Sequence, residues 1–142
     1  MLYIYYDNPT FEDLVSEISA ICQDNHVAHQ LTSTVELLNA LDLYLIFGMN
    51  NFHSKIRPCN YIIVQLESSV LDNRHCFTQQ YIDYLQHARM ILDYSLVNCL
   101  YLRQEFHLSS IEYVPITYLS HRNFNGPNSC GHTCNNNYEY DI

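Results

Sequence analysis

Basic residues are scarce in this chain of 142 residues, which has six lysines and arginines against fifteen aspartates and glutamates. The formal net charge is −9 with the histidines counted as neutral. A protein that binds nucleic acid needs a basic stripe that displaces counterions from phosphates, and the sequence contains none. The composition therefore argues against nucleic acid as a partner.

Glycine is also scarce, with three residues in the whole chain. The glycine-dependent motifs GxGxxG, GxxxxGK[ST] and GxSxG are all missing from the sequence. Their absence disfavours a dinucleotide-binding fold of the usual type, a P-loop NTPase and a hydrolase with a nucleophile elbow. His75 and Cys76 are adjacent, but neighbours in sequence do not make a nucleophile–base pair.

Long apolar runs are absent as well. No stretch approaches the ~18–20 apolar residues that a membrane span requires. The amino-terminal stretch MLYIYYDNPTFED has neither the basic region nor the long apolar core of a signal peptide. We therefore expect no membrane span and a cytoplasmic location, where the six cysteines are thiols rather than disulfides.

The apolar residues, 48% of the chain, are sufficient for the core of one domain. Several of them form short continuous runs, which is typical of strands buried on both faces in a parallel sheet. Polar turns bound these runs. The expected strands are Leu2–Tyr6, His26–Leu31, Leu43–Phe47, Tyr61–Leu66, Met90–Leu92 and Ile111–Tyr118.

Segments whose apolar residues recur at helical spacing lie between most of these strands. Apolar residues recur at intervals of three and four between residues 11 and 21, which predicts a helix that stops near Asp24. Thr10, with Asp13 three residues on, is its predicted amino-terminal cap. The other expected helices are Thr34–Leu41, Gln79–Arg89 capped by Thr78, and Leu96–Phe106 capped by Ser95. The alternation predicts a three-layer, doubly wound, mostly parallel α/β sheet of the Rossmann-like kind. We expect it to be a single domain over residues 1–118, followed by a polar tail over 119–142.

Polar side chains follow the expected strands where those strands end. Asp7 and Asn8 follow the first strand, and three further groups follow the later ones: Gly48 with Asn50, Gln65 with Glu67, and Asp93 with Tyr94 and Ser95. Ligands of open parallel sheets bind beyond the carboxyl ends of the strands, and the helix start at Ser95 offers free N–H groups to an anion or a sugar oxygen. The alternative is that Ser95 only caps its helix.

The tail contains Cys130, His132 and Cys134, which are three possible metal ligands. Their spacing is short, and structural zinc takes four ligands, usually in two separated pairs. His121 is the one candidate for a fourth ligand. We therefore expect a tail that happens to carry two thiols, and no metal site.

Four segments carry a resemblance to a known family: LYLIFGMNNF, RPCNYIIVQLESS, FTQQYIDYLQHARMILDYSLVNCLYL and IEYVPITY. Together they resemble the amino-terminal half of GT-B type glycosyltransferases, and above all the glycosyltransferase-like proteins of large DNA viruses and some bacteria. The matching elements are a Q-x-E strand end at Gln65 and Glu67, an L-D-Y-S segment at Leu92–Ser95 with Asn98, and a Y-V-P strand at Tyr113–Pro115. The likeness covers about Leu2–Tyr118.

The resemblance implies roles for the polar strand ends. Glu67 or Asp93 would be the catalytic base, and the substrate-binding residues would be Gly48, Asn50, Gln65, Tyr94, Ser95 and Asn98. A nucleotide sugar would be the donor substrate, with no further cofactor and no metal. A viral member of this group would reside in the host cytoplasm or the virion.

One departure from the family pattern bears on function. A GT-B enzyme has two such halves, and the reaction occurs in the cleft between them, whereas here a polar tail follows the Y-V-P strand. Half a cleft neither excludes water nor positions two substrates. The expected function is sugar transfer together with a partner half. The alternatives are a domain that binds an acceptor or sugar without turnover, and an inactive scaffold or virion protein.

Overall fold

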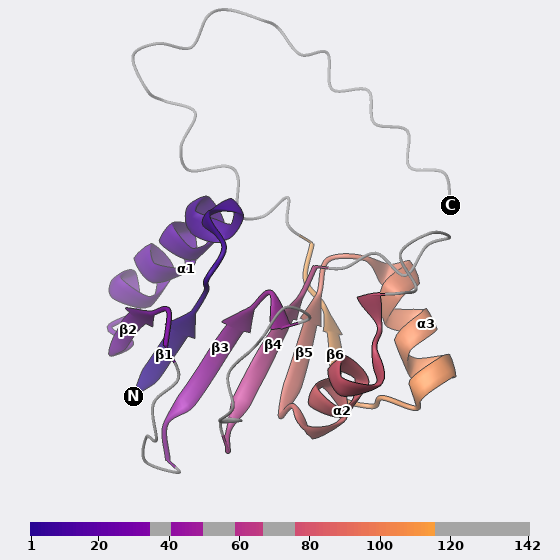
Figure 1. Ribbon diagram of the computed structural model, residues 1–142. Helices are drawn as coiled ribbons and strands as arrows, with labels where there is room; N and C mark the ends of the chain where they lie inside the picture. The colour runs from indigo at the N-terminus through magenta and orange to yellow at the C-terminus, as the bar shows by residue number, and fades with distance from the viewer. Residues whose placement is uncertain (35–40, 50–58, 67–75, 116–142) are drawn as a thin grey trace, which may run out of the picture.

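The computed structural model describes residues 1–34, 41–49, 59–66 and 76–115. Six strands form one sheet, and helices lie on both of its faces (Figure 1). The strands are β1 (Leu2–Tyr5), β2 (His29–Thr32), β3 (Leu43–Phe47), β4 (Tyr61–Gln65), β5 (Met90–Asp93) and β6 (Ile111–Tyr113). The helices are α1 (Glu12–Asp24), α2 (Gln79–His87) and α3 (Leu96–Phe106), with a 3-10 turn η1 (Pro9–Phe11) before α1.

The strand order in the sheet is β2-β1-β3-β4-β5-β6, and every neighbouring pair is parallel. This confirms the predicted doubly wound, Rossmann-like α/β fold. The chain steps from β1 to β2 in one direction and from β3 to β6 in the other. The topological switch point therefore lies between β1 and β3, where loops leave the sheet in opposite directions.

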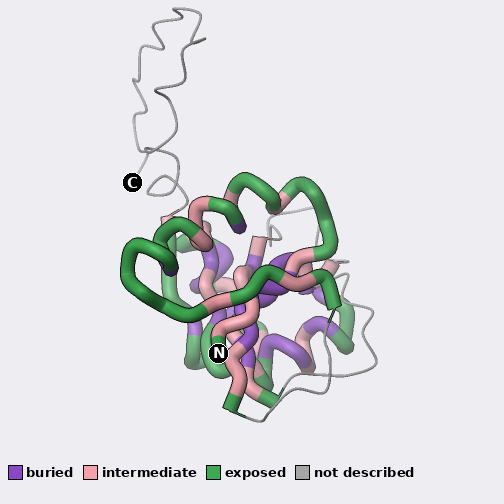
Figure 2. The backbone as a smooth tube through the Cα atoms, turned by 90° about the vertical axis from the view of Figure 1, so that its left-hand side faces the viewer, coloured by how far each residue is buried: buried purple, intermediate pink, exposed green. Residues whose placement is uncertain are grey.

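The two faces of the sheet carry different helices because crossovers between parallel strands are right-handed. The connections through α2 and α3 run toward β6, and both helices cover one face. The connection through α1 runs from β1 to β2, in the opposite direction, and α1 covers the other face. Figure 2 shows the buried residues gathered along the central strands and the inner sides of the helices.

Each face has its own apolar core. The larger core, under α2 and α3, includes Ile46, Ile63, Ile91, Leu85 and Leu102, each no more than 1% exposed. The smaller core, under α1, consists of Ile4, Val15, Cys22, Leu45 and Phe47. Burial of strands on both faces explains why β3 and β4 are continuous apolar runs.

Two predicted caps are confirmed and one is wrong. Thr78 accepts a hydrogen bond from the Tyr81 N–H at 3.2 Å, and Ser95 accepts one from the Asn98 N–H at 3.3 Å. The predicted Thr10 cap is wrong, because the side chain of Asn8 accepts from the Thr10 N–H at 2.9 Å. Asn8 is extended and Pro9 follows it, which favours the 3-10 turn η1 in front of α1.

Some predictions fall outside the described residues. They include most of the expected helix Thr34–Leu41, the polar tail 119–142 and the three tail residues Cys130, His132 and Cys134. The last strand was predicted to run to Tyr118, whereas β6 ends at Tyr113. Pro115, two residues later, has no N–H to donate to a sheet ladder.

The four described cysteines, Cys22, Cys59, Cys76 and Cys99, are free thiols. Burial raises the pKa of the Cys22 and Cys99 thiols above the ordinary value, so both remain uncharged. As to membranes, no helix among the described segments combines the length and the apolar character that a span requires.

Candidate functional site

Three of the predicted site residues form a buried polar cluster, Gln65, Asp93 and Asn98, at the carboxyl ends of β4 and β5. Each is no more than 1% exposed. Gln65 lies opposite Asp93 in the parallel register, and Asn98 comes from the first turn of α3. The Asn98 side-chain amide donates to Asp93 Oδ1 at 3.3 Å, and the Tyr81 hydroxyl donates to Gln65 Oε1 at 2.8 Å. The cluster is thus tied to both helices on that face.

Asp93 is the acid of this cluster, and its pKa is shifted. Burial raises its pKa from 3.8 to about 6, against the opposing effect of hydrogen bonds from the Ser95 N–H and from the side chains of Asn98 and Gln65. The Ser95 N–H donates to Oδ1 at 2.8 Å, while Oδ2 has no hydrogen-bond partner among the described residues. At neutral pH the protein therefore carries a buried charge that is only partly satisfied.

The polar groups at the start of α3 form hydrogen bonds with one another. Asp93 accepts the Ser95 N–H and Ser95 accepts the Asn98 N–H, so two of the donors expected to meet an anion are bonded within the chain. The Asp93 carboxylate also lies at the positive end of the helix dipole. Both contacts favour the capping alternative for Ser95. Tyr94, half-buried, lines an apolar hollow that Asp93 also lines.

Gly48 follows β3 at the switch point. Its φ of +69° lies in the left-handed region, and a Cβ at this position would be 3.0 Å from Phe11 Cε2. The Phe11 ring also packs against Phe47, with the ring centroids 6.0 Å apart. Glycine is therefore required both for the turn and for the close approach of a ring.

Substituting Gly48 with alanine should lower the free energy of unfolding by about 2 kcal/mol, because the left-handed conformation costs roughly 1–2 kcal/mol and the Phe11 ring must also move. Urea unfolding under reducing conditions measures the change. Gly48→Asn is the comparison, since asparagine tolerates a positive φ but keeps the Cβ. A change below about 0.5 kcal/mol for Gly48→Ala, the size of an ordinary surface substitution, would contradict the assignment.

Asn50 and Glu67 lie outside the described residues, so their predicted roles stay predictions. Of the remaining predicted residues, Gln65, Asp93 and Asn98 meet directly, with Ser95 bonded to the same group. Gly48 lies beside the Phe11 ring, and Tyr94 lines the apolar hollow together with Asp93.

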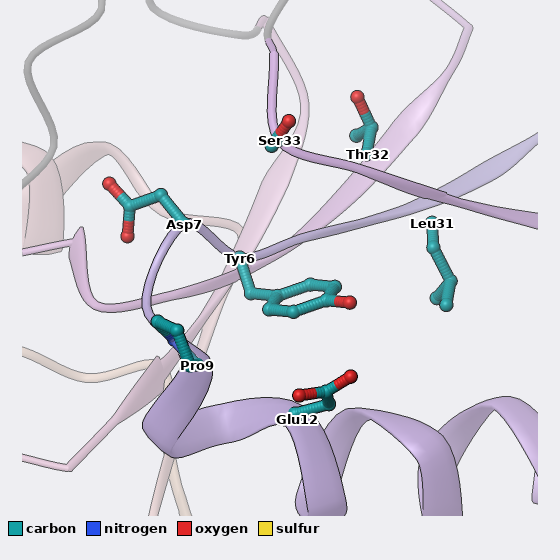
Figure 3. A pocket seen from close by; sticks show the side chains of 7 residues that line it. All are labelled: Tyr6, Asp7, Pro9, Glu12, Leu31, Thr32 and Ser33. Carbon is teal, nitrogen blue, oxygen red and sulfur yellow. The ribbon is translucent and has the colours of Figure 1, made fainter.

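A second polar site, here called the β1–β2 cavity, lies at the carboxyl ends of β1 and β2 beside the start of α1 (Figure 3). Its volume is about 380 Å³. In Figure 3 the Tyr6 ring extends between Glu12 on α1 and the end of β2. The lining residues are Tyr6, Asp7, Pro9, Glu12, Leu31, Thr32 and Ser33.

The β1–β2 cavity is acidic. The described residues of its lining include two carboxylates, Asp7 and Glu12, and no lysine, arginine or histidine. Asp13 adds a further acidic side chain to the first turn of α1. Burial, the charge of Asp7 and a hydrogen bond to it all raise the pKa of the neighbouring Tyr5. Such a lining favours hydroxyl donors or cations over anions.

The sequence placed Asp7 at the edge of the sheet but gave no indication of Thr32 and Ser33. The segment that forms β2 is short and mostly exposed, and it is not an apolar run. No group of three or more His, Cys, Asp or Glu that could hold a metal ion occurs within residues 1–34, 41–49, 59–66 and 76–115. Comparison of the chain with protein-family models, with curated proteins and with solved structures finds no match.

Proposed function

We propose that this chain is the acceptor-binding half of a glycosyltransferase-like protein, and that it holds a neutral, hydroxyl-rich sugar in the β1–β2 cavity. The observation that carries the proposal is the composition of the lining among the described residues: a Tyr6 ring, two carboxylates and two hydroxyl side chains, without a basic side chain. Sugar hydroxyls donate to carboxylates, and the apolar face of a sugar ring packs on an aromatic ring. Its location at the carboxyl ends of parallel strands suits a ligand site.

The same lining disfavours the donor substrate. A nucleotide sugar carries two phosphate charges, which Asp7 and Glu12 would repel. The start of α1 already carries Glu12 and Asp13, and the start of α3 carries Asp93, so these helix ends are not open to a diphosphate. We therefore assign the donor to a partner half, supplied by another chain or domain.

In this proposal Glu67 remains the candidate base, outside the described residues. Asp93 is 1% exposed and bonded to Ser95 and Asn98, so it does not reach a substrate in this conformation. We assign it to the support of the sheet edge. Sugar transfer by this chain alone is not expected, because one half of a cleft leaves the reacting groups open to water.

The test is an NMR titration of the full chain with neutral oligosaccharides and, separately, with UDP-glucose. We expect saturable shifts at Tyr6, Thr32 and Ser33 with a neutral sugar and none there with the nucleotide sugar. Glu12→Gln should raise the dissociation constant about tenfold, which corresponds to ~1.4 kcal/mol.

Asp13→Asn is the matched control. Asp13 and Glu12 share the first turn of α1 and both are exposed, but only Glu12 lines the cavity. Equal effects of the two substitutions would show a general loss of charge rather than a contact. Binding of UDP-glucose without binding of any neutral sugar would reverse the proposal.

The second candidate is a glycosyltransferase-like scaffold without activity. The buried cluster favours it, because Gln65, Asp93 and Asn98 are bonded inside the protein rather than presented to a ligand. A chain that binds no sugar, and whose variants in this cluster change only stability, would fit the scaffold.

A further inference from the structure

A serine and a histidine meet between α1 and β2, which lie side by side at one end of the sheet (Figure 1). Ser19 is in the second half of α1, and His29 is the first residue of β2. His29 pairs with Leu2, which packs in the smaller core, so the imidazole lies on the sheet face that α1 covers. Ser19 Oγ and His29 Nε2 are 2.7 Å apart. Both residues are half-buried, so solvent reaches the pair.

The other ring nitrogen of His29 determines the direction of this hydrogen bond. Nδ1 lies 3.0 Å from the Val27 carbonyl oxygen, which can only accept, so Nδ1 carries the hydrogen of the neutral ring. Nε2 is then the acceptor, and the Ser19 hydroxyl donates to it. The hydroxyl therefore contacts a base that a third group orients, which is the arrangement of an activated nucleophile.

The surroundings of this pair favour a neutral substrate. Residues 1–34 include five aspartates and glutamates and no lysine or arginine, so this part of the chain repels anions. Gln23, exposed and four residues after Ser19, lies on the same side of α1. Its side-chain amide is a donor that suits the oxyanion of an acyl-transfer reaction.

We propose that Ser19 and His29 form a catalytic pair that hydrolyses neutral carboxylic esters. Ser19 Oγ bonds to the ester carbonyl carbon while its proton passes to His29 Nε2. The bond from that carbon to the alcohol oxygen then breaks, and Nε2 returns the proton to the leaving alcohol. Water attacks the acyl-serine in the second half of the reaction. Nε2 takes the proton of this water and returns it to Ser19 Oγ as the carboxylic acid leaves.

The ester site is separate from the sugar site proposed above. The β1–β2 cavity includes Glu12 of α1, which precedes Ser19 by seven residues, about two helical turns. Neither Ser19 nor His29 lines that cavity. Failure of one proposal therefore leaves the other standing.

A biotinylated fluorophosphonate, which reacts with activated serine hydroxyls, tests the pair in the full chain. We expect the label on Ser19, located by peptide mass spectrometry, and a burst of about one nitrophenolate per chain from p-nitrophenyl acetate. His29→Gln should slow the labelling about 100-fold, because a general base contributes at least that much. Ser16→Ala is the matched control, since Ser16 is exposed on the same helix, and it should change neither result.

A second variant keeps the test valid if His29→Gln loosens the contact between α1 and β2. In Ser19→Cys, the introduced thiol should react with iodoacetamide about tenfold faster than the exposed Cys59, because an adjacent imidazole favours the thiolate. Mass spectrometry of the alkylated peptides separates the two thiols.

Two results would overturn the proposal. Equal labelling of Ser16 and Ser19, or of neither, together with an ordinary alkylation rate in Ser19→Cys, would show that the hydroxyl at this position is not activated. Labelling of Ser19 that His29→Gln leaves unchanged, in a chain with the far-ultraviolet circular dichroism of the wild type, would show that His29 only ties β2 to α1.

Discussion

Between about pH 4 and pH 6 the free energy of unfolding of the wild-type protein should fall as the pH rises. Replacing Asp93 with asparagine should abolish this fall. The pKa of Asp93 is raised by burial from 3.8 to about 6, so the folded state binds more protons than the unfolded state within this interval. Stability therefore falls as the pH rises through it. Below about pH 4 the carboxyl group is protonated in both states and the contribution is fully present, whereas above pH 6 it is lost.

The expected size is about 3 kcal/mol, because each unit of pKa difference corresponds to 1.36 kcal/mol and the difference is about two units. Relative to the wild type, Asp93→Asn should become more stable by this amount between pH 4 and pH 7. An asparagine retains an oxygen for the Ser95 N–H, which now donates to Asp93 at 2.8 Å. Urea unfolding of both proteins across this range, under reducing conditions, gives the difference.

Asp13→Asn is the control, since Asp13 is exposed on the first turn of α1. Its difference from the wild type should remain nearly flat between pH 4 and pH 7. A flat difference for Asp93→Asn as well would contradict a buried carboxylate with a raised pKa. A direct check is the ¹³C resonance of the Asp93 carboxyl carbon, which should titrate near pH 6.

The parts of the fold that the sequence predicted well have strong local signals. The apolar run of β3 and the helix α3, which begins after the Ser95 cap, have the predicted bounds. Each depends on contacts within a few residues or on burial on both sides of a strand. Such features are encoded in the residues of the element itself.

The start of β2 was harder to predict, because no glycine marks the turn after α1. The chain leaves α1 through His26 with a φ of 56°, and the Val27 N–H bonds to the Cys22 carbonyl at 2.8 Å. Histidine here takes the left-handed position that glycine usually fills. This turn delays β2, which starts at His29 and not at the predicted His26. His107, with a φ of 53°, ends α3 in the same conformation.

The β1–β2 cavity was not predictable for a different reason. Its lining comes from residues 6–12 and 31–33, which become neighbours only because β2 pairs with β1 at one end of the sheet. A pattern of strands and helices gives the class of fold but not the order of strands. The cluster of Gln65 and Asp93 was easier, since consecutive strands in a parallel sheet often pair.

Substituting Asn98 with leucine should destabilise the protein by about 2–3 kcal/mol at pH 7, which is the usual contribution of a hydrogen bond to a buried charge. The Asn98 side-chain amide donates to Asp93 Oδ1 at 3.3 Å, and leucine preserves volume while removing the donor. The hydrogen bond favours the charged carboxylate, so its loss should raise the pKa of Asp93 further. The cost should therefore shrink to about 1 kcal/mol at pH 4, where the carboxyl group is neutral.

A double-mutant cycle with Asp93→Asn isolates this contact from the packing change. In the Asp93→Asn background the cost of Asn98→Leu should be nearly independent of pH, because no buried charge remains to lose its donor. Equal costs at pH 4 and pH 7 in the wild-type background would show that Asn98 acts through packing alone. A pH-dependent coupling would show that the Asn98 amide stabilises the ionised carboxylate of Asp93. The ligand-binding role that we propose therefore stays with the β1–β2 cavity, which the carboxylates of Asp7 and Glu12 line.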